Sequence, residues 1–165
     1  MPSSLPPTAA RSVLAALLAL SSLWPLAAPA ADSSEPPPAA KPAADPLASA
    51  RAHIQASRWD AAVKELKRVD ATGNADWNNL MGYALRKKTP PDLDGAQRHY
   101  DAALRIDPRH PGALEYSGEL ALMKGDLATA EAKLATLSGL CRSPCEPLDD
   151  LRQAIARYKA NGNRY

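Results

Sequence analysis

Two cysteines are the residues of this chain whose type and spacing most clearly suggest chemistry. Cys141 and Cys145 enclose Arg142-Ser143-Pro144. If the chain is exported, as its N-terminus indicates below, two cysteines this close are expected to form a disulfide that closes a small ring. A redox-active thiol pair and a metal site are the alternatives. A catalytic thiol pair usually has the spacing C-x-x-C at the start of a helix, and a metal needs two more ligands, so we favour a structural disulfide.

The other reactive residue types show no spacing typical of a catalytic or metal site. His53, His99 and His110 lie far apart and have no cysteine, histidine or carboxylate partner at zinc spacing. Acidic pairs such as Asp149/Asp150 are typical of helix starts, and the glycines are isolated, with no phosphate-binding loop. We therefore predict a chain that is not an enzyme, with no catalytic residue, no cofactor and no metal.

The charge balance argues against nucleic acid as a partner. The chain carries 20 Lys and Arg against 18 Asp and Glu, a formal net charge of +2. Loss of residues 1–30 would remove Arg11 and no acid, leaving +1. Near-neutral charge gives no electrostatic attraction to nucleic acid or to an anionic membrane surface.

The N-terminus is typical of a secretion signal. A start with Arg11 as its single base is followed by the apolar run Val13–Trp24 and by Ala28-Pro29-Ala30, a small-x-small cleavage site. The apolar run of about twelve residues is too short to span a bilayer as a helix. We predict a signal peptide at residues 1–30, an exported and most simply periplasmic protein, and no stable membrane insertion after cleavage. Secretion from the cell and an uncleaved anchor are the alternatives.

A proline-rich segment follows the predicted signal. Six of the 16 prolines fall between Pro29 and Pro46, among alanines and charged residues. Such a segment has little apolar surface to bury and cannot offset the entropy of ordering. We predict a Pro/Ala-rich disordered linker at residues 31–45, with a ligand for a proline-binding groove as the alternative, and a folded region at residues 46–160.

The folded region repeats itself every 34 residues. In the stretch Asp92–Pro108, small or ring-bearing residues occupy three slots, and residues of similar type recur one period before and one after. The three sets are Ala96, Tyr100, Ala103; Ala62, Leu66, Val69; and Ala130, Leu134, Leu137. A fixed period of this length is typical of a helical repeat array.

The apolar spacing and the turn residues predict seven helices. Asp92 and Asp126 are suited to cap helix N-termini, and Gly125 suits the left-handed position after a helix. The expected helices cover 47–57, 59–69, 75–88, 93–107, 111–124, 127–138 and 147–160. This predicts an all-α solenoid of three antiparallel helix pairs, with repeats at about 46–72, 75–108 and 111–140, closed by a capping helix at 147–160.

The repeats resemble the tetratricopeptide repeat family. The second copy supplies Met81-Gly82 on its first helix, then Ala96, Tyr100, Ala103 and a closing proline on its second. Departures are Ser117 before Gly118, Ala50 where the first copy wants glycine, and Arg142 in place of the third closing proline. The resemblance implies that the packing residues are Ala62, Leu66, Gly82, Ala96, Tyr100, Ala103, Pro108, Gly118, Ala130 and Leu134.

The resemblance also implies a function, because the first helices of such arrays line a concave face that receives a peptide. By position, that face would present Arg51, Gln55, Asn79, Tyr83, Arg86, Glu115, Glu119 and Leu122. The Lys and Asn set that clamps a C-terminal carboxylate in some family members is not reproduced. The resemblance therefore implies a non-enzymatic protein- or peptide-binding adaptor of the bacterial cell envelope.

Two alternatives remain beside the adaptor. Cys141 and Cys145 could make the chain a thiol-redox accessory protein. Self-association is also possible, because three repeats leave an open end at Leu47–Ala56 that a second copy could cover.

Overall fold

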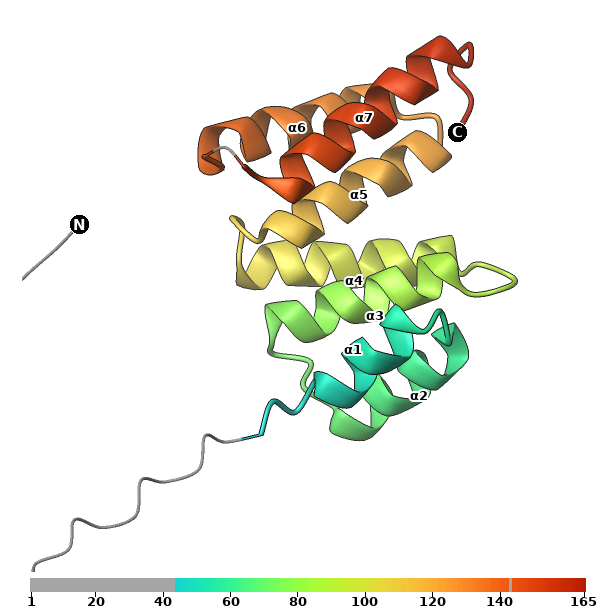
Figure 1. Ribbon diagram of the computed structural model, residues 1–165, viewed down its shortest axis with the longest axis vertical. Helices are drawn as coiled ribbons and strands as arrows, with labels where there is room; N and C mark the ends of the chain where they lie inside the picture. Colours follow the sequence, from blue (N-terminus) through green and yellow to red (C-terminus); the bar gives the residue numbers. More distant parts are fainter. Residues whose placement is uncertain (1–43, 143) are drawn as a thin grey trace, which may run out of the picture. The chain divides into compact units, whose positions relative to one another are not determined.

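The computed structural model describes residues 44–142 and 144–165, and this part of the chain is entirely helical (Figure 1). Its helices are α1 (Ala48–Gln55), α2 (Trp59–Val69), α3 (Ala75–Lys87), α4 (Leu93–Ile106), α5 (Pro111–Met123), α6 (Leu127–Leu140) and α7 (Glu146–Ala160). None of these helices has the length and apolar composition that a bilayer crossing requires. The predicted signal and most of the predicted linker lie outside the described residues.

The helices associate in consecutive pairs. α1 lies against α2, α3 against α4 and α5 against α6, and α7 packs on both α5 and α6 (Figure 1). Contacts of α2 with α3 and of α4 with α5 join each pair to the next. The predicted fold class is therefore confirmed: an all-α solenoid of three helix pairs, similar to tetratricopeptide arrays, with α7 covering the last pair.

Polar side chains at the helix starts fix where four of the helices begin. Asn74, Asp92, His110 and Asp126 each accept a hydrogen bond from the backbone N–H three residues later, at 2.9, 2.8, 3.1 and 2.9 Å. Such caps satisfy amide groups that have no partner within the helix. The caps at Asp92 and Asp126 were predicted from the sequence, and Gly125 has the expected positive φ of 79°. The cap at His110 was not foreseen.

Two glycines allow close contacts between helices. A Cβ atom on Gly82 would lie 2.6 Å from Cε1 of Tyr100, and one on Gly118 would lie 2.7 Å from Cδ2 of Leu151. Neither distance is compatible with a side chain larger than hydrogen. The repeat position of these glycines therefore has a steric cause: the ring of Tyr100 and the side chain of Leu151 fill the space.

Most of the predicted packing residues are buried. Those with little or no exposed surface are Ala62, Leu66, Gly82, Ala96, Tyr100, Ala103, Gly118 and Ala130. Leu134 is partly buried, and Pro108 is exposed in the turn that follows α4. Leu122, which the repeat pattern assigned to the concave face, is instead 1% exposed and belongs to the core among α5, α6 and α7. That assignment was wrong because α7 covers this side of α5.

Candidate functional site

An ion pair joins the first helices of the second and third repeats. Nη2 of Arg86, in the last turn of α3, lies 2.6 Å from Oε2 of Glu119 on α5. The arginine side chain is 4% exposed and the glutamate side chain 16%, so the pair is shielded from solvent. Burial opposes the charge of Arg86, but Tyr100 and the carboxylate of Glu119 raise its pKa above the usual value. The guanidinium is therefore held charged between the two repeats.

Tyrosine rings enclose this guanidinium. Cζ of Arg86 lies 5.5 Å from the ring centroid of Tyr83 and 5.6 Å from that of Tyr116, within the range of cation–π attraction. The two ring centroids are 4.6 Å apart. We call Tyr83, Arg86, Tyr116 and Glu119 the Arg86 cluster. Tyr116 was not among the residues predicted from the sequence, although it lies one turn before Glu119.

The floor of the cluster holds polar atoms without protein partners. Among the described residues, Nε of Arg86 and the hydroxyl of Tyr100 are buried and accept or donate no hydrogen bond. Burial raises the pKa of Tyr100, so its phenol stays protonated and remains a donor. These groups lie beneath the rings of Tyr83 and Tyr116 and give the cluster a polar interior.

The aromatic surface continues from the cluster onto the first repeat. The ring of Trp59, the first residue of α2, lies 5.7 Å from that of Tyr83 in an edge-to-face arrangement at 74°. Nζ of Lys87 lies 6.0 Å from the centroids of both rings. We call Trp59, Tyr83 and Tyr116 the aromatic run. All three side chains are partly exposed, so the run is accessible from solvent.

Glu115 lies beside the cluster in an unusual electrostatic environment. The residue is 6% exposed, and no ion pair neutralises it among the described residues. Burial, aided by the negative charges of Glu119 and Asp150, raises the pKa of Glu115 to about 8. At neutral pH this side chain is therefore mostly protonated and acts as a hydrogen-bonding group rather than a charge.

The remaining predicted groove residues do not join the cluster. Asn79 is 7% exposed and faces the start of α5, where a Cβ on Gly112 would come within 2.9 Å of its Nδ2. Gln55 is exposed at the last residue of α1. The structure thus brings together Tyr83, Arg86 and Glu119, with Glu115 adjacent. A bound molecule would meet Tyr83 and Glu119, because Asn79, Arg86 and Glu115 are buried.

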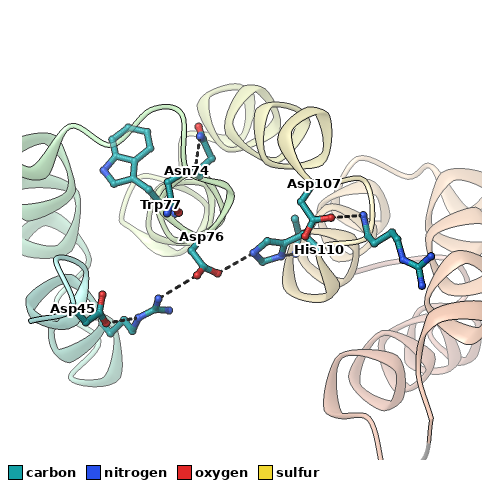
Figure 2. Close-up of polar contacts among 10 residues, drawn as sticks. Asp45, Asn74, Asp76, Trp77, Asp107 and His110 are labelled. Atoms are coloured by element: carbon teal, nitrogen blue, oxygen red, sulfur yellow. Dashed lines mark hydrogen bonds and ion pairs between the residues drawn. The ribbon is translucent and has the colours of Figure 1, made fainter. Parts of the chain in front are cut away.

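Arg51 belongs to a separate chain of polar contacts that connects the three first helices (Figure 2). Its Nε lies 3.4 Å from Oδ2 of Asp45 and its Nη2 3.5 Å from Oδ2 of Asp76, whose Oδ1 lies 3.0 Å from Nε2 of His110. Asp76 and Arg86 are ten residues apart on α3, about 15 Å at 1.5 Å per residue. The contact chain therefore links the repeats at the opposite end of α3 from the Arg86 cluster.

The geometry at His110 fixes its tautomer. Its Nδ1 accepts the hydrogen bond from the N–H of Ala113, so the proton of the neutral ring is on Nε2 and is donated to Asp76. The other two histidines have different surroundings: His99 Nδ1 lies 3.0 Å from Oδ1 of Asn78, and His53 accepts from Nε of Arg58. Within residues 44–142 and 144–165, no group of three or more His, Cys, Asp or Glu side chains is arranged to hold a metal ion.

The C-terminal residues turn back toward the cluster. Gly162 and Asn163 have φ values of 66° and 62°, and the N–H of Asn163 donates to the carbonyl of Tyr158 at 2.9 Å. The returning segment and α7 enclose a cavity of about 270 Å³, lined by Ala154, Arg157, Tyr158, Asn161, Arg164 and Tyr165. Burial and the charge of Glu119 raise the pKa of Tyr165, so its ring lies close to the cluster. Nothing in the repeat pattern indicated this contact.

The two cysteines occupy the turn between α6 and α7. Cys141 is the residue after α6 and Cys145 the residue before α7, and their sulfur atoms lie at a bonding distance of 2.13 Å. A covalent link at this position holds the start of α7 to the end of α6. The cysteines lie away from the Arg86 cluster in sequence and are contributed by other helices.

Comparisons with known proteins identify the fold. No protein-family model and no curated protein matches the sequence. Among solved structures, the chain is similar to the type III secretion chaperone SycD of Yersinia enterocolitica, crystallised with a peptide of the translocator YopD. The two chains share 18% identity and superpose with a TM-score of 0.58 over 71% of this chain and 92% of that chain. At this identity the likeness supports the fold and carries no residue roles.

Proposed function

We propose that this protein is a non-enzymatic adaptor that binds a peptide, or a segment of a partner protein, on the face formed by α3 and α5. The observation that carries the proposal is the Arg86 cluster continued by the aromatic run. Tyrosine, tryptophan and arginine side chains are the ones that most often dominate the energy of protein interfaces. Here they are partly exposed yet held in place by an ion pair between two repeats.

The surrounding structure supports this proposal. Rigid side chains lose little entropy when a ligand binds, and the Arg86–Glu119 pair restrains both helices that carry the tyrosines. SycD, a protein of similar fold, was solved with a bound peptide, which makes a peptide a reasonable ligand class for this face. None of these residues forms an arrangement of nucleophile, base and orienting group, so we propose binding rather than catalysis.

We further propose that the protein acts outside the cytoplasm, in the bacterial cell envelope. The secretion-signal pattern at residues 1–30 supports this location. The bonding distance between Cys141 and Cys145 supports it as well, because disulfides persist mainly in oxidising compartments. Fusion of residues 1–30 to a reporter enzyme that is active only after export tests this proposal, and an inactive fusion would contradict it.

A peptide-display selection tests the binding function. Random peptides are selected in parallel on the intact chain and on variants Tyr83→Ala and Ile106→Ala. Ile106 is an exposed apolar residue at the end of α4 and serves as the matched control. We expect enriched peptides that bind the intact chain and the Ile106 variant but not the Tyr83 variant. Enriched peptides that bind all three alike would place the interaction elsewhere and refute the proposal.

A further inference from the structure

The aromatic run has dimensions that restrict what can bind it. Its successive ring centroids are 5.7 and 4.6 Å apart, so the outer rings of Trp59 and Tyr116 are separated by at most about 10 Å. A polyproline II helix rises about 9 Å per turn of three residues. One turn of such a helix therefore matches the length of the run, and each ring can receive the face of a pyrrolidine ring.

The charges around the run add a second restriction. Arg86 is paired with Glu119 and buried, whereas Lys87 is exposed and has no ion-pair partner among the described residues. Its Nζ lies 6.0 Å from the rings of both Trp59 and Tyr83. The cation available to a ligand thus lies at the Trp59 end of the run, where it favours an acidic residue.

An amphipathic helix is a poorer match for this surface. Helix-binding grooves are lined with aliphatic and aromatic pockets that receive large side chains at i, i+3, i+4 and i+7. Within the described residues, the only large hydrophobic side chains that are strongly exposed are Ile106 and Tyr165, and neither belongs to the run. Proline-rich segments instead bind to partly exposed aromatic rings and lose little conformational entropy, because their backbone is already extended.

We propose that the aromatic run binds a proline-rich segment in the polyproline II conformation, with an acidic residue beside the prolines placed next to Lys87. This proposal rests on the proposed peptide-binding function and names the class of peptide. Trp59 and Tyr83 contact the prolines, Tyr116 extends the contact toward α5, and Lys87 sets the preference for acidic flanks.

Fluorescence anisotropy of labelled peptides with the full chain tests the proposal. The probes are hexaproline flanked by glutamates, hexaproline flanked by lysines, and a glutamate-flanked peptide of glycine and serine. We expect saturable binding of the first probe, weaker binding of the second and none of the third. The same titration with Pro36, Pro37 and Pro38 changed to Ser removes the chain's own proline run as a competitor.

Single variants locate the interaction. Trp59→Leu and Tyr83→Leu should each weaken binding of the glutamate-flanked hexaproline by about 2- to 10-fold, the range typical of an aromatic contact. Lys87→Glu, at an exposed site that should not affect folding, should weaken the glutamate-flanked probe and strengthen the lysine-flanked one. Ile106→Ser is the matched control, and thermal melting verifies that each variant is folded.

Three results would overturn the inference. They are the absence of saturable hexaproline binding to either form of the chain, equal affinity for the glycine–serine probe, and unchanged affinity in folded Trp59→Leu and Tyr83→Leu variants. The display selection separates this failure from failure of the proposed function. Selected peptides that lack prolines yet depend on Tyr83 would leave the binding function intact and refute only the proline specificity.

Discussion

Nε2 of His110 lies 3.0 Å from Oδ1 of Asp76, a residue that precedes it by 34 positions, one repeat length. The same ring accepts the backbone N–H of Ala113 and so caps α5. One side chain thus ends the turn before the third repeat and attaches that repeat to the second. Asp76 in turn contacts Arg51 on α1, which extends the connection to the first repeat.

Replacement of His110 should destabilise the array through both of its contacts. His110→Ala loses the cap and the bond to Asp76, and we expect a loss of about 1–2 kcal/mol in the free energy of unfolding. His110→Asn keeps a capping side chain but is too short to reach Asp76, so its loss should be smaller. Urea denaturation measures both. Equal losses in the two variants would show that the contact between repeats contributes nothing.

Two glycine-to-alanine substitutions should have opposite effects. Gly82→Ala places a methyl group against the ring of Tyr100, and overpacking of this kind costs about 1–3 kcal/mol. Gly139→Ala, on α6, meets no atom within 4 Å and should gain up to about 1 kcal/mol from helix propensity. Thermal melting of the two variants tests the packing. A stabilised Gly82→Ala variant would contradict the close approach of α3 and α4.

Glu115 should make stability depend on pH. Its folded pKa of about 8 is above the ordinary value of 4.5, so the folded chain binds the proton more tightly. The associated stability is fully present below about pH 4.5 and is lost as the pH rises to about 8. Glu115→Gln should therefore gain stability over the parent across this interval, by about 1–2 kcal/mol at pH 8 once solvent screening is allowed for. A difference between the two proteins that does not change with pH, measured by urea denaturation, would contradict this account.

The cysteine pair should contribute to stability and not to binding. A ring this small is worth about 2 kcal/mol in the loop-entropy description, so the double variant Cys141→Ser/Cys145→Ser should unfold at lower urea concentration. Its affinity for a display-selected peptide should match that of the parent chain. Loss of binding in a variant that remains folded would favour the thiol-redox alternative. Thiol titration of the native protein should find neither cysteine free.

The sequence predicted the features of the fold that depend on spacing. A 34-residue period requires similar helix pairs, and Asp92 and Asp126 have the side chains that cap helices, so both helix order and two starts could be foreseen. Leu122 was misplaced because the pattern treats α5 as if one side were open, whereas α7 covers it. Residue boundaries of the signal and linker stay predictions.

The candidate site was only partly predictable, because its character comes from contacts between distant residues. Repeat positions selected Tyr83, Arg86 and Glu119, but the burial of Arg86 depends on a carboxylate 33 residues later. Tyr116 was missed because one helix position away from a predicted face cannot be told from solvent by spacing alone. Tyr165 follows the last helix and belongs to no repeat, so only the turn at Gly162 and Asn163 brings it near the cluster.

The central claim is that the face formed by α3 and α5 binds a peptide. Photo-crosslinking tests it most directly, with p-benzoylphenylalanine placed at Tyr83 or, as a control, at Ile106 in the intact chain. The account predicts that a display-selected peptide crosslinks at position 83 and that unlabelled peptide competes it away, with no crosslink at position 106. A crosslink at position 106 alone, or equal yields at both positions, would contradict the claim.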